Sequence, residues 1–172
     1  TPKMTDLDTL RYPVGKFEVP LTIDQVDIPE LINNMAVFPG KIRHETILLS
    51  DTQLETPYRE GGWTIRQVVH HVADSHINCY CRFKLALTED HPVIKPYLEA
   101  KWAELPDGKS APVNISLNLI DAVHLRLVLF LRSLQKSDFL RSYQHPEQQR
   151  SFYLFQVLAN YSWHCDHHLA HI

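Results

Sequence analysis

Three long stretches of this chain contain neither glycine nor proline, although the sequence has 5 glycines and 11 prolines in all. They cover residues 63–91, 113–145 and 147–172. Because proline removes a backbone hydrogen bond from a helix and glycine weakens it, these stretches are the natural places for long helices. Short segments of alternating apolar and polar residues, the pattern of half-buried strands, are hard to find. The chain therefore predicts an all-α protein.

The first of these stretches begins with a clear signal for a helix N-terminus. Thr64 is followed three residues later by Gln67, which makes a capping box, and Trp63 and Val68 hold the two positions of a hydrophobic staple. Apolar residues then recur every three or four positions over residues 65–87. This spacing predicts an amphipathic helix of about seven turns.

Apolar residues recur at helical spacing in three further stretches. Two are regular and predict helices over residues 116–134 and from Ser151 to the end of the chain. The third covers residues 22–50, where Pro29 and the pair formed by Pro39 and Gly40 interrupt the pattern. Proline is poorly tolerated inside a helix, so we expect a kink there or two shorter helices.

The connections between these helices differ in length. Four prolines fall within residues 92–112, which predicts a long irregular crossover, and residues 1–21 hold three more prolines and predict an extended arm. Four helices with one long crossover indicate a four-helix bundle. A length of 172 residues is typical of one domain, so we expect residues 1–172 to form a single bundle.

The charge balance and hydropathy argue against several partners. Lys and Arg total 17 against 20 Asp and Glu, a net charge of −3, whereas general nucleic-acid binders carry a basic excess. The most apolar stretch, residues 122–131, is interrupted by His124 and Arg126 and is too short and too polar to span a bilayer. The first residues show no signal sequence, and three cysteines form no even disulfide framework. We therefore expect a reduced, cytoplasmic protein.

Histidine is the unusual residue of this composition, with 11 copies. Seven of them lie in two short clusters: His70, His71 and His76, then His164, His167, His168 and His171. His164 and His168 are one helical turn apart, a spacing that lets two imidazoles bind one metal ion. At about 100° per residue, His168 falls inside the apolar arc of its helix and His164 at the edge. His167 and His171 have the same spacing and remain an alternative pair, and the competing interpretation is a row of surface histidines.

A catalytic metal site of this kind takes three protein ligands and keeps one position open, so the third ligand should come from another helix. Periodicity ranks His76 first because it lies in the middle of the apolar face, whereas His70 points away and His71 sits at the border. Three polar residues share the border with His71: Ser75, Asn78 and Arg82. A polar line beside an apolar face suits the wall of a pocket between helices, and it equally suits a solvated flank. A hydrogen-bonded core histidine is the competing interpretation of His76.

Several segments of the chain form a recognisable combination. The longest begins at Leu54 and reads Leu-Glu-Thr-Pro-Tyr-Arg-Glu-Gly-Gly-Trp-Thr-Ile-Arg-Gln-Val-Val-His-His-Val-Ala-Asp-Ser-His. Shorter ones are Tyr-Pro-Val-Gly-Lys at 12–16, Arg-Phe-Lys-Leu-Ala-Leu-Thr-Glu at 82–89, Lys-Pro-Tyr at 95–97, Trp-Ala-Glu-Leu at 102–105 and the last ten residues. Together they resemble the DinB superfamily, and closely its YfiT-like branch of metal-dependent hydrolases, which includes bacillithiol transferases.

This resemblance implies a four-helix bundle that holds one divalent metal ion, nickel or zinc, with three histidines. One ligand follows the Gly-Trp-Thr helix start by eight residues and corresponds to His71, and the spaced pair of the last helix corresponds to His164 and His168. The resemblance therefore selects His71 over His76, which periodicity left open. It also implies a homodimer. The chain departs from the family at Ile172, because relatives usually continue for a short tail.

Three neutral imidazoles leave a divalent ion its full charge. At an open position the ion can therefore bind water or a thiol and lower the pKa of that ligand. Water would make a hydrolase, and a thiol would make an S-transferase acting on an electrophile. The resemblance to thiol transferases favours a low-molecular-weight thiol of the bacillithiol type. Arg82 and Asn78 are then candidates for binding its carboxylates. No carboxylate on the inward helix faces suggests itself as a general base, which counts modestly against hydrolysis.

The remaining alternatives are weaker. Cys165 lies between the candidate ligands but on the apolar face, so we expect an inert core thiol rather than a nucleophile. The competing class of function is a non-catalytic metal-binding or structural bundle. Its metal site would be closed by a fourth protein ligand such as His76 or His167, which leaves no room for a small-molecule substrate.

Overall fold

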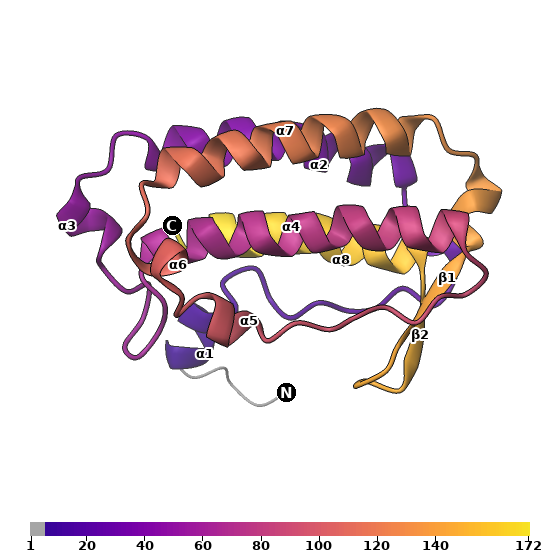
Figure 1. Cartoon of the computed structure of the whole chain (residues 1–172), viewed down its shortest axis with the longest axis horizontal. Helices are drawn as coiled ribbons and strands as arrows, with labels where there is room; N and C mark the ends of the chain where they lie inside the picture. The colour runs from indigo at the N-terminus through magenta and orange to yellow at the C-terminus, as the bar shows by residue number, and fades with distance from the viewer. Residues whose placement is uncertain (1–5) are drawn as a thin grey trace.

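The computed structural model describes residues 6–172, so part of the predicted arm, residues 1–5, lies outside the described residues. Its four long helices are α2 (Ile28–Thr46), α4 (Ile65–Thr88), α7 (Val113–Arg132) and α8 (Leu154–Leu169). Helices α2 and α7 form one layer and α4 and α8 the other (Figure 1). Each helix packs against one neighbour in its own layer and one in the other layer. The prediction of a four-helix bundle is confirmed.

Helix α2 differs from the prediction because it is one continuous helix of 19 residues. Pro29 lies in its first turn, where a backbone N–H has no partner within the helix, and Asp27 caps that turn by accepting from the N–H of Glu30. Pro39 lies inside the helix and is buried beside Phe38, whose packing in the core holds the backbone. Of the two expected forms, a kinked helix or two shorter helices, the division into two is therefore wrong.

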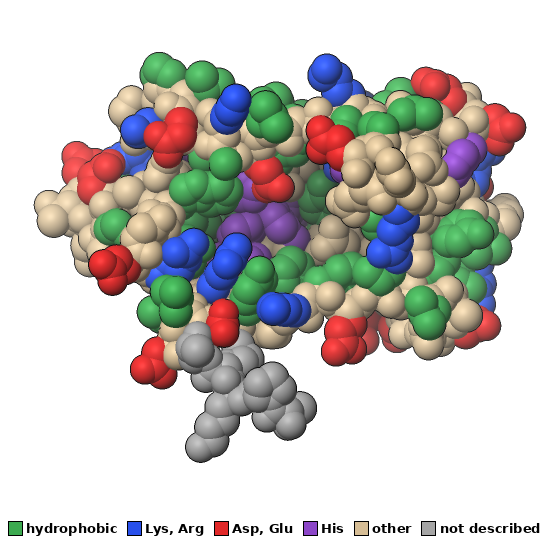
Figure 2. Space-filling view, turned by 90° about the horizontal axis from the view of Figure 1, so that it is seen from below, with side chains coloured by type: hydrophobic (Ala, Val, Ile, Leu, Met, Phe, Trp, Pro, Cys, Tyr) green, Lys and Arg blue, Asp and Glu red, His purple; other side chains and the backbone are tan. Residues whose placement is uncertain are grey.

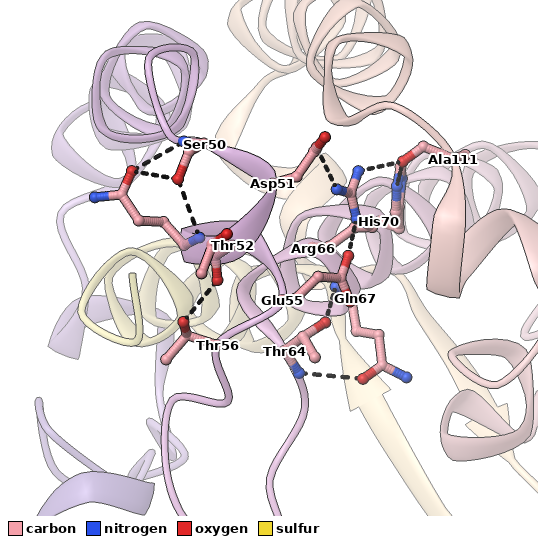
Figure 3. Close-up of polar contacts among 11 residues, drawn as sticks. Ser50, Asp51, Thr52, Glu55, Thr56, Thr64, Arg66, Gln67, His70 and Ala111 are labelled. Carbon is pink, nitrogen blue, oxygen red and sulfur yellow. Dashed lines mark hydrogen bonds and ion pairs between the residues drawn. The ribbon is translucent and has the colours of Figure 1, made fainter.

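Helix α4 begins as the capping box predicts. The hydroxyl of Thr64 accepts from the N–H of Gln67 and the side chain of Gln67 accepts from the N–H of Thr64, both at 3.1 Å (Figure 3). The buried guanidinium of Arg66 then donates to Glu55 at 2.6 Å and to Asp51 at 3.0 Å. Asp51 opens the short helix α3 (Asp51–Leu54), so these bonds fix the end of α4 that carries the first histidine cluster.

Two strands were not predicted. Strand β1 (Ser142–His145) pairs antiparallel with β2 (Arg150–Tyr153), and α8 begins only after this hairpin. The last helix therefore starts at Leu154 and not near Ser151. Strands of four residues are too short to show a convincing alternation of apolar and polar residues.

The arm and the crossover contain short helices. The expected extended arm is wrong for Asp6–Arg11, which forms α1. The crossover contains α5 (Glu99–Trp102) and α6 (Pro106–Ser110), and 3₁₀ turns η1 (Ile23–Gln25) and η2 (Lys136–Leu140) precede α2 and β1. The arm and the crossover run along the face of the α4 and α8 layer that is turned away from α2 and α7 (Figure 1).

Polar contacts attach the arm to α8. The indole N–H of Trp163 donates to the carbonyl of Gly15 at 3.1 Å, and the amide of Gln156 donates to the carbonyl of Pro20 at 2.9 Å. Gly15 has a φ of +83°, in the left-handed region that favours glycine. The ring of Tyr12 stacks on His167 at 5.9 Å between centroids. The segment at 12–16 is thus part of the surroundings of the histidines.

Helix α7 is the one helix among residues 6–172 that is long and apolar enough to cross a membrane by length and composition. Its inner face carries fully buried side chains such as Ile120, Leu127 and Leu131. That face packs against α2 and α4. Part of the apolar character of α7 is therefore used in the core of the bundle, while apolar side chains on its outer face stay exposed.

Candidate metal centre

Three histidines from two helices meet on the side of the α4 and α8 layer that faces the arm and the crossover. His71 comes from α4 and His164 and His168 come from α8, one turn apart. Their candidate ligand atoms all lie within 4.8 Å of one another, and Nε2 of His71 is 3.3 Å from Nε2 of His164. Viewed from the side of the arm, histidine side chains gather in a recess near the middle of the surface (Figure 2).

Burial keeps these imidazoles neutral. Loss of solvent, together with charge repulsion from His167 and His171, lowers the pKa of His71 to about 4. Desolvation also holds the pKa of His164 and of His168 well below the usual range. A neutral imidazole offers a lone pair, which is the form that binds a metal ion. The cluster is therefore ready for a cation at neutral pH without first losing protons.

The hydrogen bonds of the two α8 histidines fit a metal site. Nδ1 of His164 is 3.0 Å from Nε2 of His76, and Nδ1 of His168 is 3.1 Å from Nδ1 of His171. Each ring thus uses Nδ1 for a neighbouring histidine and has Nε2 left over. Metal-binding histidines characteristically make such a bond through the nitrogen that does not touch the metal. The donor set suits a divalent ion such as zinc or nickel.

The other members of the first histidine cluster have separate roles. His70 points away from the cluster: its Nδ1 is 2.6 Å from the hydroxyl of Ser116 on α7, and its Nε2 is 2.8 Å from the carbonyl of Ala111 after α6. His76 is fully buried and hydrogen-bonds through both ring nitrogens, to His124 and to His164. Neither ring joins the group formed by the three converging histidines.

Two further groups in residues 6–172 bring ligand atoms together: His76, His124 and Cys165, then His167, His168 and His171. Burial raises the pKa of the Cys165 thiol well above its usual range, so it stays protonated, and it lies 3.6 Å from the sulfur of Met35. Metal binding requires the thiolate. Cys165 therefore behaves as a core thiol.

In the other group, His167 is stacked on Trp163 with ring centroids 4.3 Å apart.

A cavity of about 420 Å³ adjoins the cluster at His164. It is enclosed by α4, the crossover, the hairpin, α8 and the arm. Ser75 and Arg82 line it, as do Tyr97 and Tyr161. Asn78 is not among the lining residues, because its amide donates at 2.8 Å to the Asp74 carbonyl of its own helix. The size is in the range of small-molecule sites.

Glu99 supplies a carboxylate that the sequence interpretation missed. Its Oε2 lies 3.7 Å from Nε2 of His71, and the residue lines the cavity. Although 60% of the side chain is exposed, desolvation raises the pKa of Glu99, while the charge of Arg82 acts in the opposite direction. The search for a general base on the inward faces of the long helices therefore could not find this carboxylate. Only helix faces were searched, whereas Glu99 stands in the crossover between two matching segments, Lys95-Pro-Tyr and Trp102-Ala-Glu-Leu.

The fold and the cluster together define a helical-bundle protein with three converging histidines that could hold a metal ion beside a small-molecule cavity. The sequence profile of the DinB superfamily matches residues 43–172. The chain belongs to this family. The predicted resemblance is therefore confirmed.

Relatives extend over nearly the whole chain. A protein of Bacillus pumilus named "putative metal-dependent hydrolase" is 46% identical over 166 residues, which is 96% of this chain and 94% of that protein. One of Bacillus mycoides with the same description is 48% identical over 163 residues, covering 95% and 93%. The chain is accordingly related to a group described as metal-dependent hydrolases.

Solved structures agree in fold. YfiT from Bacillus subtilis, described as "a probable metal-dependent hydrolase with an unusual four-helix bundle topology", superposes with a TM-score of 0.92 at 43% identity, covering 95% of this chain and 94% of that one. A mycothiol-dependent maleylpyruvate isomerase superposes with a TM-score of 0.64 at 17% identity, covering 86% of this chain and 63% of that one. The second likeness shows the fold alone.

Proposed function

We propose that this protein is an enzyme in which His71, His164 and His168 hold one divalent ion, nickel or zinc. The proton of a small nucleophile is removed there, and the nucleophile attacks an electrophilic substrate in the adjoining cavity. The observation that carries the proposal is the convergence of three neutral imidazoles from α4 and α8, whose ligand atoms lie within 4.8 Å of one another next to a cavity of about 420 Å³.

Each part of the site has a distinct task. A divalent ion with an open position lowers the pKa of a water molecule or a thiol. The carboxylate of Glu99, 3.7 Å from Nε2 of His71, is placed to accept the proton that the nucleophile gives up. Arg82 on the cavity wall can pair with an anionic group of a substrate. Burial raises the pKa of Tyr97 to about 12, so its phenol stays protonated and can donate a hydrogen bond.

The nucleophile distinguishes two reactions. Glu99 and the names of the relatives favour water, which makes the protein a hydrolase. Arg82 and the second arginine of the cavity, Arg150, favour a low-molecular-weight thiol with carboxylates, of the bacillithiol type, which makes it an S-transferase. We place the thiol reaction first, because these two arginines offer binding for carboxylates that a simple hydrolase does not need.

The deciding experiment compares turnover of the thiol-reactive electrophile monochlorobimane by the metal-loaded protein with and without bacillithiol. Formation of the thiol adduct faster than in the uncatalysed reaction supports S-transfer. Product release that ignores the thiol contradicts S-transfer and leaves hydrolysis. A non-catalytic metal-binding or structural bundle is favoured by two results together. The visible spectrum of the cobalt-loaded protein stays unchanged when any thiol is added, and monochlorobimane is not turned over either with or without bacillithiol.

The family resemblance also supports a cytoplasmic homodimer. Exposed apolar side chains on the outer face of α7, among them Ile115, Leu125 and Leu129, offer surface that a second copy could cover. Light scattering on the purified protein tests this assembly. A mass of one chain at all concentrations contradicts the dimer without affecting the metal site.

A further inference from the structure

Beside the three candidate ligands lie three further histidines, His76, His124 and His171, whose hydrogen bonds have a definite donor and acceptor. Nδ1 of His124 lies 2.8 Å from the backbone carbonyl of Met35. A carbonyl only accepts, so His124 carries its proton on Nδ1 and has a bare Nε2. His124 belongs to α7 and Met35 to α2, so this bond lies between the two helices of the other layer.

The order of donors and acceptors continues from His124 through His76 to His164, a candidate metal ligand. The bare Nε2 of His124 meets Nδ1 of His76, which must therefore carry the proton and leave Nε2 of His76 bare. That nitrogen is 3.0 Å from Nδ1 of His164, which carries the next proton. Nε2 of His164 is then bare, and it is the atom that lies 3.3 Å from Nε2 of His71.

A second, shorter chain leads to the other ligand of α8. Nε2 of His171 lies 3.0 Å from the backbone carbonyl of Arg11 in the arm, so His171 carries its proton on Nε2. Its bare Nδ1 is 3.1 Å from Nδ1 of His168, which must donate. Nε2 of His168 is therefore bare as well. The two chains start from backbone carbonyls on different elements and end with the same tautomer.

We infer that His76, His124 and His171 are positioning residues that hold the protons of His164 and His168 on Nδ1 and so keep both Nε2 lone pairs available for one cation. This inference rests on the proposed function, in which these two histidines and His71 are ligands. Outer-shell partners of this kind typically change metal affinity by about 10- to 100-fold when they are removed.

The assignment also explains why His76, His124 and Cys165 are not a second metal site. In this row of hydrogen-bonded histidines, Nδ1 of His76 and Nε2 of His124 share a hydrogen bond. Their other ring nitrogens form hydrogen bonds with His164 and with the Met35 carbonyl. A second ion would need lone pairs that these bonds occupy. We therefore expect no second ion at His76, His124 and Cys165.

The tautomers can be read directly in the metal-free protein by long-range ¹H–¹⁵N spectroscopy with ¹⁵N-labelled histidine. The expected result is a proton on Nδ1 for His164 and His168 and on Nε2 for His171. His70, whose Nε2 donates to the Ala111 carbonyl, provides an internal reference for the Nε2 tautomer. An Nε2 proton on His164 or His168 overturns the inference, and this measurement needs no variant to fold.

Metal affinity, measured by competition with a chelator for zinc, tests the same inference independently. His171→Phe keeps a ring to stack on Tyr58 but removes both nitrogens, and we expect zinc binding to weaken by about 10- to 100-fold. His171→Gln keeps an acceptor and a donor and should stay close to wild type. His70→Phe removes a buried histidine outside the two chains, so it should alter stability while zinc affinity is retained.

The outcomes separate the two proposals. Wild-type zinc affinity in His168→Ala contradicts the proposed site itself. Loss of zinc in His168→Ala together with unchanged affinity in His171→Phe overturns only the positioning role. A second zinc ion bound by His76 and His124 also overturns it, because the nitrogen atoms that form the hydrogen-bonded chain would then be metal ligands.

Discussion

Oε2 of Glu99 lies 3.7 Å from Nε2 of His71, which brings a carboxylate from the crossover to a histidine of α4. The contact joins the short helix α5 of the crossover to the long helix α4. It supplies a proton acceptor at the edge of the histidine cluster, on the side of the cavity.

Replacing this carboxylate should slow the reaction without removing the metal. We expect Glu99→Gln to lower kcat by about 100-fold or more, because general-base catalysis typically contributes about 10²- to 10⁴-fold. Metal content, measured by elemental analysis, should stay at the wild-type value. Glu104→Gln is the matched control, since Glu104 stands in the same crossover but bonds to Lys109 and Gln67. Unchanged kcat in Glu99→Gln contradicts the assigned role.

Removing one ligand should abolish metal binding and activity together. His168→Ala leaves two imidazoles, whereas a catalytic site of this type takes three protein ligands. Elemental analysis after dialysis should show little metal, and turnover should fall to background. His44→Ala, on the exposed surface of α2, should behave as wild type. Full activity in His168→Ala refutes its assignment as a ligand.

Arg82 should act on the substrate and not on the metal. If it pairs with a carboxylate of the thiol, we expect Arg82→Gln to raise KM for bacillithiol by about 10- to 100-fold, since a hydrogen bond to a charged group contributes about 1.5–3 kcal/mol. The KM for a thiol without carboxylates, such as 2-mercaptoethanol, should change little. Equal effects on both thiols would show that Arg82 does not recognise the carboxylates.

Stability of the metal-free protein should fall as the solution becomes acidic. His71 and His167 each have a pKa lowered to about 4 in the folded chain, and the cause is mainly burial. In the unfolded chain they titrate near about 6.5, so below that pH the unfolded state binds more protons. The free energy of unfolding is therefore independent of these groups above about pH 7 and decreases from about pH 6.5 toward pH 4.

Urea unfolding at a series of pH values measures this decrease. Each histidine that is protonated only when unfolded contributes a slope of about 1.4 kcal/mol for each pH unit. The double variant His71→Gln with His167→Gln should show a shallower slope. A free energy of unfolding that stays constant from neutral pH down to about pH 5 contradicts the burial of neutral imidazoles.

The bundle was predictable from the sequence because each long helix follows strong local rules. The capping box of Thr64 and Gln67 lies where it was expected, and the stretches without glycine or proline contain α4, α7 and α8. Pro39 misled the prediction, because tertiary packing around Phe38 overrides the preference of one residue. The hairpin was missed because its four-residue strands carry too little pattern.

The candidate site was only partly accessible from spacing. The i, i+4 relation places His164 and His168 on one face, but periodicity could not choose between His71 and His76, and both prove to lie next to His164. Glu99 could not be found from the faces of the long helices, because it lies in the short helix α5 and the path of the crossover depends on long-range packing. The part played by His171 depends on a carbonyl of the arm, which no local pattern encodes.

The two histidine chains start from main-chain oxygens, those of Arg11 and Met35. Because every amino acid has a main-chain oxygen, a substitution at either position keeps the acceptor as long as the backbone conformation is unchanged. Only displacement of the segment itself can break them. Metal affinity should consequently depend on whether the N-terminal arm packs against α8, although the arm itself contributes no metal ligand.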